Sequence, residues 1–187
     1  MLLTEIFNQP AEFTMSVQAP NHAVYQFEVG NQQYYADFQP LGGLLWLFNF
    51  FQRTRATGDR MFGGGTPRLT GNAGIKSIEV FSTVIAIMRD FEQKYNPRAI
   101  FIAADATEAG RAPLYRRMIN RLLPGGWQAF VTTITRDQDP LRTEREGYIL
   151  TRGVPIARAA TSLQTFGITP DQWRPFGERN EIRRTAA

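Results

Sequence analysis

The chain has 187 residues, no cysteine, one histidine, 43% hydrophobic residues and a formal net charge of +4. This length predicts one domain, or one domain with an appendage, whose core is large enough to fold without disulfides. The absence of cysteine excludes thiol catalysis and cysteine zinc sites, and a single histidine excludes histidine-rich metal sites. We therefore expect no metal site. Any catalysis is expected to use the side chains of Asp, Glu, Tyr, Ser, Lys or Arg, or backbone groups.

Arginine supplies almost all of the positive charge, because Lys76 and Lys94 are the two lysines. Arginine binds phosphate and carboxylate with two parallel hydrogen bonds, so an anionic partner is one interpretation; an arginine bias of the genome is the other. The longest apolar run, Leu44 to Phe51, is far shorter than the roughly 20 residues of a membrane span. No basic and apolar leader opens the chain, so we expect a cytoplasmic protein without a signal peptide.

The N-terminal third predicts β-strands. Three short segments alternate apolar and polar residues, and turn signals separate them. The segments are 13–17, 25–29 and 33–38, and the turns are 19–22 and 30–31. This pattern predicts an antiparallel meander with one buried face, in which His22 lies exposed in a turn. Pro40 and the glycines at 42–43 are expected to end the meander, and the apolar segment 44–51 predicts a central strand.

Residues 52–74 have no periodicity and contain three consecutive glycines and several arginines. Loops longer than about 12–15 residues in compact domains are usually functional or disordered, so this one is either a binding element or a mobile flap.

The second half of the chain predicts alternating helices and strands. Apolar residues from Ile75 to Tyr95 follow a helical period, which Asn96-Pro97 ends. The later elements, in order, are a buried strand at 99–104, a helix around Pro113 that ends at 124–126, and strands at 127–135 and 146–152. Residues 136–145 alternate in charge and predict a solvated hairpin tip. Residues 1–153 are expected to form one α/β domain with a mixed sheet, and 154–187 an extension that packs on it and frays at its end.

A short motif directly before the long helix is the strongest candidate site. It consists of Arg68, Gly71, Asn72, Ala73 and Gly74. Glycines let the backbone approach a ligand, and the free N–H groups at a helix N-terminus favour a phosphate or pyrophosphate. The alternative is an ordinary glycine turn at a helix entry. It is not a Walker A loop, because no Gly-Lys-Ser/Thr follows.

The pattern Arg68-x-x-Gly71-x-Ala73 resembles the R/Q-x-x-G-x-G/A signature of the GNAT superfamily of N-acetyltransferases. Leu114-Tyr115 resembles the L-Y pair that the family carries on its next helix. The resemblance covers roughly residues 25–152, and 80–122 is also similar to small proteins of tailed bacteriophages. It implies a GNAT-like α/β fold with a mixed, mostly antiparallel twisted sheet flanked by helices. It further implies that the loop holds the pyrophosphate of acetyl-CoA, and that the central strand splays from its neighbour and binds the pantetheine arm.

The first functional hypothesis follows from this resemblance: transfer of an acetyl group from acetyl-CoA to an amine of a protein or small molecule, in the host cytoplasm if phage-encoded. Tyr115 would protonate the leaving thiolate, as the matching tyrosine does in the family. The alternative for Tyr115 is simple packing of the helix on the sheet. Asp37, Glu28 and Glu79 are candidates for the general base by rough location alone.

Two other hypotheses stay open. The fold could lack catalysis and bind a host or virion protein, which Glu108 and Arg111 favour because the family has Asn and Ala there. Alternatively, arginines around the second helix could bind nucleic acid, although a solvated helix face explains them as well. These arginines are Arg111, Arg116, Arg117 and Arg121.

Overall fold

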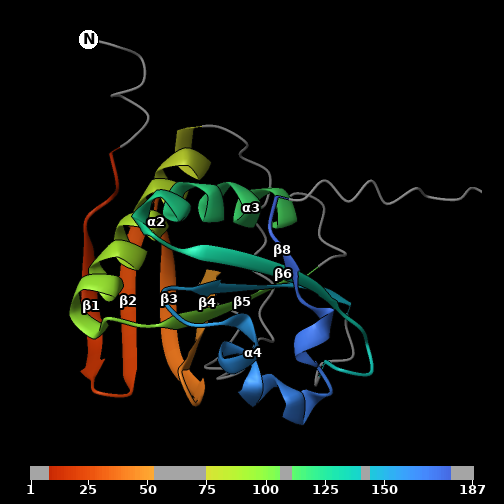
Figure 1. Ribbon diagram of the computed structural model, residues 1–187. Helices are drawn as coiled ribbons and strands as arrows, with labels where there is room; N and C mark the ends of the chain where they lie inside the picture. Colours follow the sequence, from red (N-terminus) through yellow and green to blue (C-terminus); the bar gives the residue numbers. More distant parts are fainter. Residues whose placement is uncertain (1–8, 53–74, 106–110, 140–143, 178–187) are drawn as a thin grey trace, which may run out of the picture.

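A single eight-stranded sheet organises the part of the chain that the computed structural model describes, residues 9–52, 75–105, 111–139 and 144–177 (Figure 1). The strand order is β1-β2-β3-β4-β5-β7-β6-β8. All neighbouring strands are antiparallel except β4 and β5, which are parallel. The predicted mixed, mostly antiparallel α/β fold is therefore confirmed. The strands are β1 (Phe13–Ala19), β2 (His22–Val29), β3 (Gln32–Gly42), β4 (Leu45–Gln52), β5 (Ala99–Asp105), β6 (Gln128–Ile134), β7 (Arg145–Thr151) and β8 (Arg174–Pro175).

Helices cover both faces of the sheet. The long helices α2 (Ile75–Tyr95) and α3 (Arg111–Leu122) share one face and one core cluster. The C-terminal segment packs on the other face over β5, β6 and β7. It consists of α4 (Ile156–Ala159) and the 3-10 turns η2 (Thr161–Phe166) and η3 (Pro170–Gln172), and a further turn, η1 (Leu123–Gly125), follows α3. No helix within the described ranges is long and apolar enough to cross a membrane.

The first three strands form the predicted antiparallel meander, and β4 extends it, because β4 pairs antiparallel with β3. Gly30 and Asn31 turn the chain between β2 and β3 with φ values of 57° and 63°, a left-handed conformation that glycine and asparagine adopt most easily. Gly42 and Gly43 end β3 as expected, but Pro40 does not, since β3 continues through it to Gly42. Proline has no backbone N–H, but β3 tolerates it at position 40 because pairing with β2 stops at Phe38. The register of β3 against β4 shifts just after it, between Pro40 and Gly42.

Helix α2 has the predicted bounds and docks through its apolar side. Val84, Met88 and Phe91 are buried, and the ring of Phe91 stacks on Phe38 of β3 with centroids 3.8 Å apart. Ile78 belongs to the same predicted apolar stripe, but it is 39% exposed, because no described residue covers this end of the helix.

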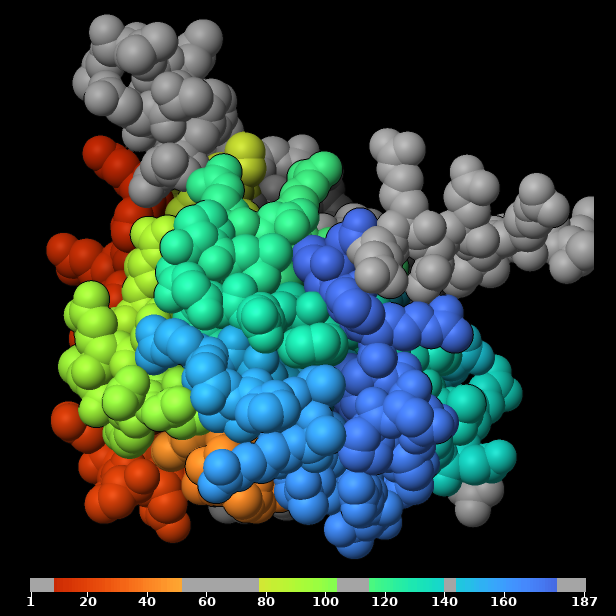
Figure 2. Space-filling view, viewed as in Figure 1, coloured from red at the N-terminus to blue at the C-terminus, as the bar shows by residue number. Residues whose placement is uncertain are grey.

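The C-terminal segment closes a second core. Leu163, Ile168 and Trp173 are buried against the sheet, and Trp173 meets Phe101 of β5 edge-to-face at 6.3 Å. In Figure 2 this segment forms the blue surface in the lower part of the view, below the green surface that includes α3. The short strand β8 pairs with Phe130 and Val131 and was not predicted from the sequence.

Candidate functional site

The parallel strands β4 and β5 stop pairing half-way along their length. Their register runs from Leu45 opposite Ala99 to Phe48 opposite Ile102, and no described residue beyond these continues it. Yet β4 stays paired with β3 up to Gln52, and β5 stays paired with β7 up to Asp105. The sheet therefore divides between residues 49–52 and 103–105, and the facing backbone groups of these two segments lack strand partners. We call this part of the sheet the strand divergence.

Both long helices begin at the end of the sheet where β4 and β5 diverge. Helix α2 connects the parallel strands β4 and β5, so it has to run back along the sheet. Its C-terminal Tyr95 lies at the opposite end of the strands, where its hydroxyl donates to the carbonyl of Ala19 at 3.0 Å. Helix α3 follows β5, and its Arg116 contacts Glu146, which pairs with Ala104 in the diverging part of β5. The helix N-termini add partial positive charge to this edge.

Five of the predicted site residues belong to the segment between β4 and α2. Arg68, Gly71, Asn72, Ala73 and Gly74 lie outside the described residues. The described chain enters this segment at the end of β4 and leaves it at the start of α2. The predicted pyrophosphate loop therefore stays a prediction, although it joins two elements that meet at the strand divergence.

The predicted catalytic residue Tyr115 lies in the first half of α3. Its side chain is half-buried and packs against the core cluster that α2, α3 and the sheet share. The next residue, Arg116, is anchored to β7 beside the strand divergence, so Tyr115 lies near the same edge of the sheet. Its position is compatible with both interpretations, a proton donor and a packing residue.

A polar cluster of Arg116, Glu146 and Tyr148 fixes α3 to β7. Arg116 donates from Nε and Nη2 to Oε1 of Glu146 at 3.0 and 2.7 Å, and the hydroxyl of Tyr148 donates to the same oxygen. Burial, followed by the hydrogen bond to Glu146, raises the pKa of Tyr148 far above its ordinary value. Hydrogen bonds to Tyr148 and Glu146 raise the pKa of Arg116. Arg116 is therefore not simply a solvated helix residue, and the cluster holds the start of α3 in place.

The sequence analysis missed this cluster, although one signal was present. Glu146 and Tyr148 are two residues apart on a predicted strand, so their side chains had to share a face. The partner on α3 depends on tertiary packing. In the charged hairpin Arg136 and Asp137 are exposed, as predicted, but Asp139 is 8% exposed and accepts a hydrogen bond from Arg145 at 2.9 Å.

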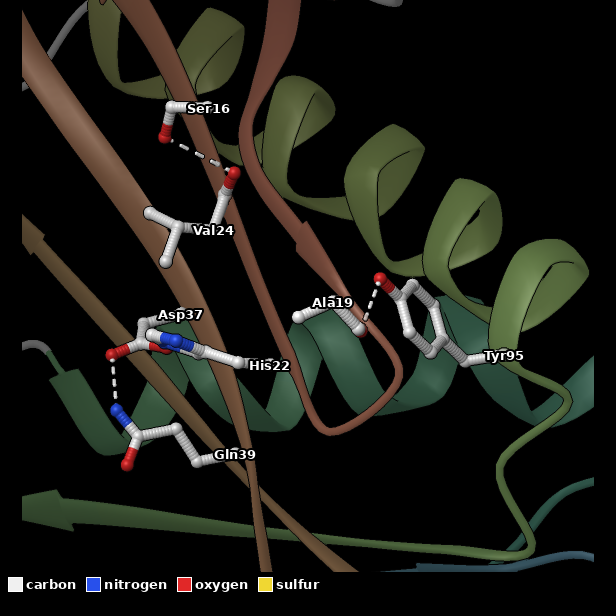
Figure 3. A network of polar contacts seen from close by, with 7 residues as sticks. All are labelled: Ser16, Ala19, His22, Val24, Asp37, Gln39 and Tyr95. Carbon is white, nitrogen blue, oxygen red and sulfur yellow. Dashed lines mark hydrogen bonds and ion pairs between the residues drawn. The ribbon is translucent and has the colours of Figure 1, made fainter.

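The three candidate bases occupy different places. Glu28 is exposed on β2, and Glu79 is half-buried on α2. Asp37 is half-buried on β3, pairs with Asn49 at the start of the strand divergence, and contacts Nε2 of His22 at 2.8 Å. Figure 3 shows the imidazole of His22 beside this carboxylate. The expectation of an exposed turn histidine is therefore wrong, because His22 is the first residue of β2 and the hairpin register turns it toward Asp37.

Within the described ranges, no group of three or more acidic or histidine side chains is arranged to hold a metal ion. No protein-family model matches the chain, and no curated protein matches it. Among solved structures the chain is similar to RimL, a ribosomal L7/L12 alpha-N-protein acetyltransferase in complex with coenzyme A. The TM-score is 0.44 at 10% sequence identity, over 71% of this chain and 63% of that chain. The chain thus spans less than two thirds of that protein's length.

Proposed function

We propose that the chain is a GNAT-like N-acetyltransferase that binds acetyl-CoA at the strand divergence and acetylates an amine of a protein or small molecule. The similarity of residues 80–122 to phage proteins extends this proposal to action in the cytoplasm of a bacterial host. The strand divergence carries the proposal, because it is the feature that the GNAT resemblance implies and that the pairing of β4 and β5 displays.

The chemistry of the divergence fits the pantetheine arm of acetyl-CoA. Residues 49–52 and 103–105 present N–H and C=O groups that have no strand partner. Backbone groups without partners lose stability unless a ligand or water satisfies them. An extended chain with amide groups can bind between the two strands in the way that a third strand would. The positive ends of α2 and α3 lie at the same edge and favour the phosphates.

The protein groups around the divergence have distinct tasks in this proposal. The bound thioester supplies an activated acyl carbon. A backbone N–H of β4 in the diverging segment stabilises the oxyanion that forms on the acyl oxygen. Tyr115 donates its phenolic proton to the leaving sulfur. The cluster of Arg116, Glu146 and Tyr148 keeps α3, and therefore Tyr115, in position beside the strands.

The alternative is that the chain keeps this fold without catalysis and binds a partner protein. Glu108 and Arg111 favour it, because the family has Asn and Ala at these places. Acetyl-CoA binding separates the two functions.

The test is isothermal titration of acetyl-CoA into the purified chain and into Gly71→Trp. We expect saturable binding of one ligand per chain, which the bulky residue abolishes because it blocks close approach of the backbone. Tyr115→Phe should keep the Kd of acetyl-CoA and lower kcat by roughly 10²–10⁴-fold, the usual contribution of a general acid. Tyr95→Phe, on α2 at the opposite edge of the sheet, is the matched control and should keep both.

Absence of binding at millimolar acetyl-CoA would contradict the enzyme proposal and favour the binding module. Turnover is measured as release of coenzyme A with a thiol-reactive dye, and the chain adds no background because it has no cysteine.

A further inference from the structure

The two outermost strands of the sheet differ in how their free sides are protected. Strand β1 forms one edge and, among the described strands, pairs with β2 alone (Figure 1). At the other edge, β8 covers β6 at Phe130 and Val131, and it carries Arg174 and Pro175. A charged side chain and a proline, which has no N–H, hinder the pairing of a further strand. The sequence of β8 therefore blunts that edge.

Strand β1 has neither of these protecting features. Its seven residues, Phe13–Ala19, include no proline and no charged side chain. In an antiparallel pair, every second residue directs its N–H and C=O groups away from the partner strand, so β1 presents donors and acceptors along its outer side. Within the described ranges no strand pairs with this side. An edge strand of this kind can accept a strand from another chain.

A bulge in the middle of β1 shapes this edge. The register against β2 shifts between Met15 and Val17, and the hydroxyl of Ser16 donates to the carbonyl of Val24 at 3.2 Å (Figure 3). A bulge bends a strand, so it favours the addition of a short segment over a long one. Beyond the bulge Val17 lies opposite Val24 and is 38% exposed, which leaves an apolar side chain for the added segment to contact.

The face of β1 that is turned toward α2 is apolar. Phe13 and Met15 are half-buried and pack against the core cluster that α2 shares with the sheet. Because β1 is the outermost strand, these two side chains have a neighbouring strand on one side only. Apolar side chains of an added strand would contact them as cross-strand neighbours.

The opposite face of the same edge is acidic. Phe13 pairs with Phe27, which is buried under α2, so the adjacent Glu12 and Glu28 point to the opposite face. Both are exposed, and neither forms a hydrogen bond or ion pair with a described residue. Residues 1–52 contain four Asp and Glu and no Lys or Arg, which gives this part of the chain a charge of −4. This face therefore attracts cationic side chains and repels anionic ones.

From these observations we propose that β1 binds an extended basic segment of a partner protein, which adds a ninth strand to the sheet. The segment alternates apolar residues, which cover Phe13 and Met15, with Lys or Arg, which face Glu12 and Glu28. A second copy of the chain fits less well, because it would bring two stretches of charge −4 together. The inference does not depend on acetyl transfer, since β1 lies three strands, about 14 Å, from β4.

The test measures binding of short labelled peptides by fluorescence anisotropy. The probe has four Val-Lys repeats with both ends blocked, and a peptide of four Val-Glu repeats is the control. Two further Val-Lys peptides carry N-methyl groups, one on all of its valines and the other on all of its lysines. In a strand these two sets of N–H groups point to opposite sides, so one methylated peptide should lose binding and the other should keep it. We expect saturable binding of the Val-Lys probe and none of the Val-Glu control.

Two double variants test the charge of the acidic face. Glu12→Gln with Glu28→Gln should weaken binding of the Val-Lys probe by roughly threefold to tenfold, the usual contribution of two exposed ion pairs. Asp137→Asn with Glu144→Gln changes two exposed residues of the hairpin between β6 and β7 and alters the net charge equally. This control should keep the wild-type Kd; equal weakening by both double variants would contradict binding at β1.

Methionine methyl NMR locates the bound peptide. Met15 lies on β1, whereas Met118 is buried on α3. We expect the Val-Lys probe to shift the methyl signal of Met15, which Met15→Leu assigns, and to leave the signal of Met118 in place.

Four results of the peptide experiments would overturn the proposal. They are absence of binding by the Val-Lys probe, equal binding of the Val-Lys and Val-Glu peptides, equal binding of the two methylated peptides, and a shift of Met118 without one of Met15. A chain that is dimeric by itself in gel filtration, with a Met15 signal that moves on dilution, would assign the edge to a second copy instead. None of these measurements contains acetyl-CoA, so failure here leaves the proposed function standing.

Discussion

Two fully buried tyrosines make the stability of this protein sensitive to alkaline pH. Tyr25 donates to Asp90 and Tyr148 to Glu146, and both side chains are 0% exposed. Burial first, and then the bond to a carboxylate, raises the pKa of both phenols far above the ordinary value of 10.0. Unfolded tyrosines ionise near pH 10, so above that pH the unfolded chain releases protons that the folded chain retains.

The tyrosine contribution is thus fully present below about pH 10 and is lost as the pH rises further. We expect the free energy of unfolding to fall with a slope that approaches about 1.4 kcal/mol per pH unit for each of the two residues well above pH 10 and averages about half of that between about pH 9 and about pH 11. Urea unfolding from about pH 9 to about pH 11 measures this slope, and Tyr25→Phe should reduce it by one such step. Asp90 keeps Lys94 as a partner at 2.7 Å in this variant. An unchanged slope in Tyr25→Phe would show that the phenol ionises freely; Tyr35→Phe controls for removal of a hydroxyl.

At the scale of elements, one aromatic residue of α2, Phe91, lies at the centre of the contact between this helix and the sheet. Phe91 is 0% exposed and touches the rings of Phe38, Trp46 and Tyr95. Phe91→Ala leaves a cavity between helix and sheet and should lower the free energy of unfolding by about 3–5 kcal/mol. Ile78→Ala on the same helix removes a side chain that is 39% exposed and should stay within about 0.5 kcal/mol of the wild type. Urea unfolding of both variants decides this; equal losses would contradict the observed orientation of α2.

Local signals explain which elements the sequence could predict. Helix α2 has a complete apolar period and a stop at Asn96-Pro97, and the β2–β3 hairpin has Gly30-Asn31, so neighbouring residues determine both. Strand β8 has only two residues, and it forms because Trp173 and Phe176 pack down after a segment without periodicity. Such contacts between distant residues leave no pattern in a short window of sequence.

The candidate site likewise has one part that the sequence predicts and others that depend on contacts between distant residues. Tyr115 could be proposed from its place beside Leu114, but the strand divergence depends on where the pairing of β4 with β5 ends. That end is set by the neighbours β3 and β7, which hold their partners along the full length. The contact of His22 with Asp37 likewise depends on the register of β2 against β3, which a turn signal places only to within a residue or two.

At the scale of the whole molecule, charge and topology divide the protein into two sides. Residues 1–52, which contain no lysine or arginine, form one half of the sheet with strands β1 to β4, and every lysine and arginine belongs to the chain that follows. The two halves meet at β4 and β5, where the strand divergence lies. Anionic ligands and cationic ligands would therefore each be attracted to a different side of the protein.

The C-terminal segment covers one face of the sheet, and we expect the sheet to need it for stability. Residues 154–177 bury Leu163, Ile168 and Trp173 against Phe101 and Ile149, so a chain that ends at residue 153 would expose one whole face of β5, β6 and β7. We expect this shortened chain to lose its cooperative thermal transition and to aggregate, because a large exposed apolar patch drives association. Circular dichroism on heating and gel filtration test it against a chain that ends at Gly177, which keeps all of the described segment and should melt cooperatively. A cooperative, monomeric 1–153 fragment would show instead that the segment is an extension on a domain that folds without it. In that event Trp173→Ala should cost far less than the about 3–5 kcal/mol expected for a tryptophan in a shared core.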